Sequence, residues 1–180
     1  MNDIAKELAL LHELQGADFV RQLERITSDK RFYSIENETA IFAMGDYQQE
    51  DLPSILDAAR KAVAFGYRVY LLPNPNNVRT ADFIFVRNNI YKMYDLKTIR
   101  GKASVLNRLT ESIGQTRHVL LNMTTDYNPR LLAKEIHTYF EKNPAGCEVL
   151  IFKHKKLISV TRKTLEDKNF VKTFMHSYMK

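Results

Sequence analysis

The order of hydrophobic patterns between residues 50 and 123 most limits what this chain can fold into. Apolar residues recur at helical spacing over 51–64 and 103–113, and strand-like runs occupy 67–72, 82–86, 90–98 and 118–123. Asn88 and Asn89 tolerate positive φ, so the second and third strands are expected to form a hairpin around them. The resulting order of helix, three strands, helix and strand predicts an α/β fold.

The segments on either side of this core carry their own patterns. Residues 4–14 and 19–26 keep helical spacing, and residues 31–44 contain two short strand-like runs. After the core we expect a helix at 129–141, a hairpin of 147–152 with 157–161, and a closing basic helix at 164–178. The prediction is a helical and β extension at 1–49 that packs on a domain at 50–180, in one globular unit.

Positive charge is concentrated in two blocks of the sequence. The 180 residues hold 27 Lys and Arg against 21 Asp and Glu, a net charge of +6. Residues 153–180 contribute +6 and residues 79–117 contribute +5, so the remainder is −5. Such blocks favour a polyanionic partner, nucleic acid rather than a membrane, although a basic surface that only keeps the protein in solution is the simpler alternative.

The single cysteine, Cys147, excludes an intrachain disulfide and a zinc site built from cysteines. We expect it to fill the core. The first 25 residues contain charges where a signal peptide needs an apolar run, and no stretch approaches 18 consecutive apolar residues. These features predict a cytoplasmic location.

Three residues of the predicted hairpin are candidates for catalysis: Asp82, Asp95 and Lys97. Asp95 and Lys97 are two positions apart on one strand, so their side chains share a face. Asp82 begins the partner strand, which the hairpin brings beside the end of the other. Two carboxylates and an ammonium group suit hydrolysis of a phosphodiester bond with Mg²⁺ or Mn²⁺, because hard oxygen ligands hold such ions and the metal acidifies an attacking water. The backbone carbonyl of Leu96 is a possible further ligand.

This pattern resembles the PD-(D/E)XK nuclease superfamily. The resemblance rests on Ala81-Asp82, a gap of twelve residues and Asp95-Leu96-Lys97, within the predicted order of elements. The run Asp95 to Thr98, the helix with Ser104, Asn107 and Arg108, and Gln115 before the strand at His118 are similar to the C-terminal tRNA nuclease domains of contact-dependent growth inhibition toxins. Ala81 stands where the superfamily name has proline.

The resemblance covers about residues 50–161 and implies a restriction-endonuclease-like fold, with a mixed central sheet flanked by helices. It implies that Asp82 and Asp95 bind the divalent metal, that Lys97 is the catalytic lysine, and that Gln115 completes the site or contacts substrate. It favours RNA, in particular tRNA, over DNA. A neighbouring basic group would bind phosphates, and it consists of Arg100, Lys102, Arg108 and Arg117.

Other interpretations of these residues stay open. Asp82 and Asp95 could cap a turn and a strand end, Lys97 could form a surface ion pair, and Gln115 could cap the preceding helix. Tyr91 and Tyr94 could stack bases or only pack. The protein could also be a catalytically inactive nuclease fold that binds nucleic acid or an inhibitory or scaffold protein, or a metal-independent, barnase-like ribonuclease. The oligomeric state is left open.

Overall fold

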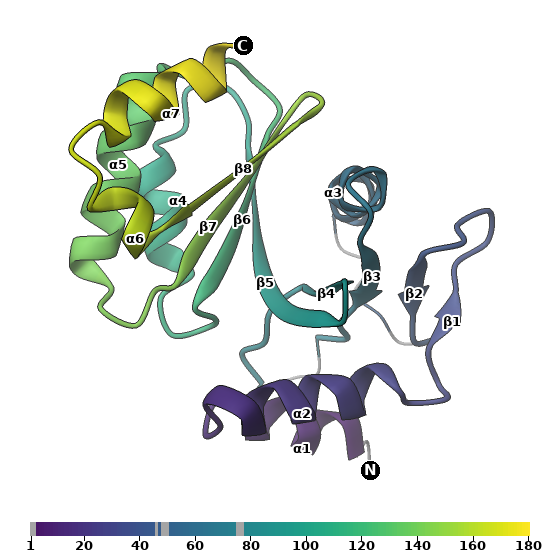
Figure 1. Cartoon of the computed structure of the whole chain (residues 1–180). Helices are drawn as coiled ribbons and strands as arrows, with labels where there is room; N and C mark the ends of the chain where they lie inside the picture. Colours follow the sequence, from purple (N-terminus) through teal and green to yellow (C-terminus); the bar gives the residue numbers. More distant parts are fainter. Residues whose placement is uncertain (1–2, 46, 48–50, 75–77) are drawn as a thin grey trace. The chain divides into compact units, whose positions relative to one another are not determined.

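The chain forms an α/β protein with one mixed sheet. This computed structural model describes residues 3–45, 47, 51–74 and 78–180 (Figure 1). Its helices are α1 (Asp3–Leu10), α2 (Gly16–Thr27), α3 (Leu52–Ala64), α4 (Val105–Glu111), α5 (Pro129–Lys142), α6 (Arg162–Leu165) and α7 (Phe170–Met179). Its strands are β1 (Tyr33–Ser34), β2 (Ile41–Ala43), β3 (Arg68–Leu71), β4 (Phe83–Arg87), β5 (Ile90–Ile99), β6 (His118–Met123), β7 (Glu148–Lys153) and β8 (Lys156–Thr161).

The eight strands pair in chain order. The pairs β2–β3, β5–β6 and β6–β7 are parallel, and the other four are antiparallel. The predicted order of helix, three strands, helix and strand is confirmed by α3, β3, β4, β5, α4 and β6. The chain forms two compact units, Met1–Tyr94 and Asp95–Lys180. The boundary between them along the sequence falls inside β5. The predicted division near residue 49 stays a prediction.

The β4–β5 hairpin forms where the sequence predicts it. Asn88 and Asn89 have φ values of 51° and 60°, and Arg87 pairs with Ile90 across the turn. Two consecutive positive φ angles give the turn a twist that matches the flanking strands. The pairing continues to Phe83 and Tyr94, so this half of β5 belongs to the first unit.

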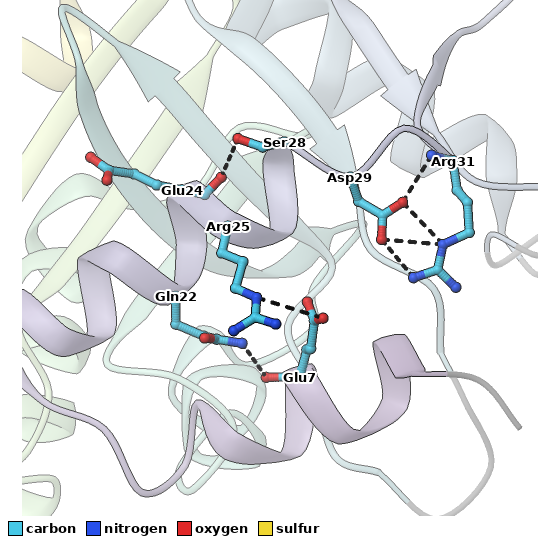
Figure 2. A network of polar contacts seen from close by, with 7 residues as sticks. All are labelled: Glu7, Gln22, Glu24, Arg25, Ser28, Asp29 and Arg31. Atoms are coloured by element: carbon cyan, nitrogen blue, oxygen red, sulfur yellow. Dashed lines mark hydrogen bonds and ion pairs between the residues drawn. The ribbon is translucent and has the colours of Figure 1, made fainter.

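In the first unit, α1 and α2 pack together through apolar residues that include Ile4, Leu8, Leu23 and Ile26. Figure 2 shows polar contacts around this pair. The amide of Gln22 donates to the carbonyl of Glu7 at 3.4 Å, and Arg25 lies 3.9 Å from the Glu7 carboxylate. The predicted N-terminal helices are therefore confirmed, and their contacts are mainly apolar.

Two further polar contacts lie at the C-terminal end of α2 and in the turn that follows it. Ser28 donates to the carbonyl of Glu24 at 2.7 Å, and Arg31 forms an ion pair with Asp29 at 2.6 Å (Figure 2). The hydrogen bonds from Arg31 lower the pKa of the Asp29 carboxyl below its usual value. The carboxylate thus helps to hold the turn that leads from α2 to β1.

The second unit has a core of its own. Buried side chains of β6 and β7 pack against α4, α5 and α7, and Figure 1 shows these helices on one side of β6, β7 and β8. Ser104 accepts a hydrogen bond from the backbone of Asn107 at 3.4 Å, so α4 begins at Val105, later than predicted. Asn128 accepts from Leu131 at 3.0 Å and begins α5, with Pro129 in its first turn.

Two predictions about these elements are wrong. The closing helix at 164–178 is broken into α6 and α7, because Asp167 accepts hydrogen bonds from the backbone of Asn169 and Phe170 and forms a turn there. Cys147 is exposed, since it lies in the loop before β7. Asp51 occupies the N-cap position of α3 without a capping hydrogen bond to its side chain, and its φ of 55° belongs to the left-handed region.

Within the described ranges, no helix is both long and apolar enough to cross a membrane.

Candidate functional site

Asp95 and Lys97 lie on the second half of β5, where this strand pairs with β6. Asp95 is opposite Val119 and Lys97 is opposite Leu121. Paired residues of neighbouring strands point to the same face, and Val119 and Leu121 belong to the core beneath the helices. Asp95 and Lys97 therefore point to the side of the sheet that carries α4, α5 and α7.

These two side chains form a buried ion pair. The Lys97 ammonium lies 3.0 Å from Asp95 Oδ2, and the side chains are 11% and 5% exposed. An exposed strand end and a surface ion pair are thus both wrong as accounts of Asp95 and Lys97. Taking two charges out of water costs several kcal/mol per ion, so a pair retained here calls for an explanation other than stability.

The carboxylate of Asp95 has hydrogen-bonding capacity left over. Lys97 approaches Oδ2 at ion-pair distance but not at a hydrogen-bonding angle, and no other described residue donates to this buried oxygen. Buried polar atoms without a donor are uncommon, and a bound ion or a catalytic role is among the usual reasons. The chemistry of this oxygen fits Mg²⁺ or Mn²⁺, which prefer carboxylate ligands.

Tyr139 of α5 adds a buried phenol on the same side of the sheet. Burial raises the pKa of Tyr139, and the negative charge of nearby Asp95 raises it further, against hydrogen bonds from Asn143 and Ser112 that lower it. The Asn143 amide donates to the phenol oxygen at 3.0 Å. Sequence reasoning did not find Tyr139, because its helical spacing resembles that of any core residue.

Asp82 lies in the first unit, just before β4. Its backbone N–H donates to the carbonyl of Tyr94 at 3.0 Å, and its carbonyl accepts from Leu72 at 2.9 Å. Asp82 is half-buried. Since Asp95 belongs to the second unit, the convergence of the two carboxylates stays a prediction.

Gln115 and Leu96 occupy defined places in the second unit. The amide of Gln115 donates to the carbonyl of Glu111 at 3.2 Å, as expected of a residue that caps the end of α4. Leu96 pairs with Leu120, and its side chain points to the opposite face from Asp95. The assignment of the Leu96 carbonyl to a metal stays a prediction.

The four residues of the predicted phosphate-binding group differ in their exposure and contacts. Arg100, Lys102 and Arg117 are exposed, whereas Arg108 forms an ion pair with Glu111 at 2.9 Å. Tyr94 is 1% exposed and packs on Phe85 with ring centroids 4.9 Å apart, so the suggestion that it stacks bases is wrong.

Histidine, cysteine and carboxylate side chains form no cluster of three or more suited to a metal in the part of the chain that the structure describes. Comparisons with protein families, curated proteins and solved structures found no match for this chain.

Proposed function

We propose that this protein is a metal-dependent nuclease of the PD-(D/E)XK type that hydrolyses phosphodiester bonds, with RNA of the tRNA kind favoured over DNA. The observation that carries the proposal is the buried Asp95–Lys97 pair, in which Asp95 Oδ2 accepts no hydrogen bond. The pair has the spacing of the D-x-K motif and lies on the third strand of the helix, three-strand, helix, strand order.

Each residue has a defined task in this proposal. Asp95 supplies a carboxylate oxygen to Mg²⁺ or Mn²⁺, and Asp82 and the Leu96 carbonyl are the predicted further ligands. The ion, when bound, polarises the phosphoryl group and acidifies a water molecule. The Lys97 ammonium balances negative charge that develops on the phosphoryl oxygens, and the Asp95 carboxylate holds the ammonium in place.

Lys97→Met and Lys153→Met test the proposal as a matched pair. Lys153 is a suitable control because its side chain is also 11% exposed and also faces a carboxylate, that of Asp126 at 3.6 Å. Labelled tRNA, single-stranded RNA and duplex DNA are each incubated with Mg²⁺, with Mn²⁺ and with chelator. We expect cleavage of tRNA that requires the metal and falls by about 100-fold or more in Lys97→Met. Both variants are checked for folding by circular dichroism, and Lys153→Met should cleave like the wild type.

Other outcomes identify the alternatives. Equal cleavage by Lys97→Met and wild type contradicts the proposed site, and cleavage that persists in chelator indicates a metal-independent ribonuclease. Binding without cleavage indicates an inactive nuclease fold. The charge of the second unit favours this second candidate, a protein that binds nucleic acid without cleaving it. The unit holds sixteen Lys and Arg against eight Asp and Glu.

A further inference from the structure

A second feature of Asp95–Lys180 is a basic surface cavity at one end of its strands. The cavity has a volume of about 450 Å³. Three of its lining residues are cationic, Arg117, Arg162 and Lys163, and none is acidic. In the sequence, 44 residues separate Arg117 from Arg162, so only the pairing of β6, β7 and β8 brings them to one place.

Backbone hydrogen bonds hold the wall that contains Arg117. The carbonyl of Arg117 accepts from Cys147 at 2.7 Å and from Glu148 at 3.3 Å. These bonds join the start of β6 to the start of β7. The Arg117 side chain is exposed, and these two hydrogen bonds fix the backbone from which it extends.

Arg162 is positioned by neutral groups. Its guanidinium donates to the carbonyls of Gly146 at 3.1 Å and Phe140 at 3.2 Å, and also to that of Asn143. Its central carbon lies 5.2 Å from the centre of the Phe140 ring. These contacts orient the guanidinium without neutralising its charge, so it is pre-organised for an anion.

The positive charge of the cavity is not balanced by ion pairs. Among the described residues, no carboxylate lies within ion-pair distance of Arg117, Arg162 or Lys163. The carbonyl contacts use Nε and Nη2 of Arg162, so Nη1 keeps its two N–H donors for a ligand. Arginine and lysine donors of this kind commonly bind phosphate. The cavity is far larger than the roughly 30 Å³ that one water occupies, and it lies within the range of small-molecule sites. Pro144 and Ala145 add apolar surface that an organic group could cover.

We propose that this cavity binds the phosphate of a nucleotide, either as a free mononucleotide or as one unit of an RNA strand. Phosphate would meet Arg117, Arg162 and Lys163, and the attached nucleoside would cover Pro144 and Ala145. The cavity is separate from the Asp95–Lys97 pair, but both lie toward the same end of β6. Strand spacing separates the two places by roughly 5–15 Å along the sheet. The inference goes beyond the proposed hydrolysis and does not depend on it.

Binding of adenosine 5′-monophosphate, with adenosine as the ligand without phosphate, tests the proposal. Titration calorimetry in chelator excludes metal-dependent cleavage from the measurement. The test variant is Arg117→Gln with Lys163→Gln, which leaves the carbonyl contacts of Arg162 in place. The control is Lys168→Gln with Lys172→Gln, which removes the same charge from exposed positions of the same unit. We expect the test variant to bind the mononucleotide at least about tenfold more weakly, and the control to stay within about twofold of wild type.

A single-stranded RNA oligonucleotide, followed by fluorescence anisotropy in chelator, provides the second arm. Because the cavity neutralises one phosphate, the test variant should reduce the slope of log affinity against log salt by at most about 0.7. Weaker binding of both ligands by the test variant supports the site. Weaker binding of only one ligand supports the site and also identifies the source of the phosphate. Equal losses in test and control variants, unchanged binding of both ligands, or adenosine that binds as tightly as its monophosphate would overturn it. Mononucleotide binding is measured in chelator and cleavage is measured with metal, so this proposal and the nuclease proposal fail separately.

Discussion

Lys97 and Lys153 are two lysines of the same exposure in very different surroundings. Lys153 lies 3.8 Å from the centre of the Tyr178 ring, donates to the Tyr178 carbonyl at 3.4 Å and faces Asp126. Lys97 has one described polar contact, Asp95. The ammonium of Lys153 is therefore bound on several sides for structural reasons, whereas the Lys97 ammonium has protons left to offer a ligand.

A double-mutant cycle of Asp95→Asn and Lys97→Met should show that the two residues are strongly coupled. Each single change leaves the other charge buried without its partner, and we expect each to cost about 3–5 kcal/mol of unfolding free energy. The double variant should lose less than the two changes together, because it leaves no unpaired charge. Urea unfolding measures the three variants and wild type. Additive losses would contradict a buried pair and place both side chains in contact with water.

At the level of elements, the two C-terminal helices show that a polar turn can end a helix although apolar residues at helical spacing lie nearby. Phe170, Phe174 and Tyr178 are buried and follow helical spacing, as α7 requires. The same periodicity does not extend back to α6, because the turn at Asp167 interrupts it. Helical spacing predicted α7 well, but it could not locate the break between the two helices.

The N-termini of α5 and α7 provide a matched test of capping. Asn128 accepts a hydrogen bond at the start of α5, whereas the Asn169 side chain forms no cap bond at the start of α7. We expect Asn128→Ala to destabilise the protein by about 1 kcal/mol and to lower Tm by about 2–4 °C. Asn169→Ala should change Tm by much less. Thermal unfolding followed by circular dichroism compares the variants, and equal shifts would contradict the role assigned to Asn128.

At the level of the whole molecule, charge is divided unequally between the two compact units. Met1–Tyr94 has eleven Lys and Arg against thirteen Asp and Glu, a net charge of −2. Asp95–Lys180 has a net charge of +8 and contains both the Asp95–Lys97 pair and the basic cavity. The two charge blocks seen in the sequence obscured this division, because the block at 79–117 includes residues of both units.

Stability at high pH should depend in part on the buried phenol of Tyr178. Burial raises the pKa of Tyr178 to about 12, from an ordinary value of 10.0. The folded state keeps its proton where the unfolded chain loses it, so this contribution to stability is complete below pH 10 and is lost as the pH rises toward 12. Tyr178→Phe keeps the aromatic ring that faces Lys153 but has no phenol to titrate. We expect its stability to fall less steeply with rising pH than that of the wild type.

Thermal unfolding at pH 8 and at pH 11 measures this effect. The wild type should lose more of its Tm between the two pH values than Tyr178→Phe does, by up to a few degrees. Tyr33→Phe is the control, since Tyr33 is 50% exposed. Parallel declines in the wild type and both variants would show that the Tyr178 phenol does not titrate differently in the folded state.

The sequence by itself determined the order of helices and strands from α3 to β6, the turn at Asn88 and Asn89, and the common face of Asp95 and Lys97. These features depend on side-chain periodicity and on backbone preferences within a few residues. Only the tertiary structure decided that the Asp95–Lys97 pair is buried, that Tyr94 is covered and that Cys147 is exposed. It also decided that Arg117 meets Arg162 and Lys163 in one cavity. Burial and charge balance depend on which distant segments pack or pair together, and sequence patterns do not specify those neighbours.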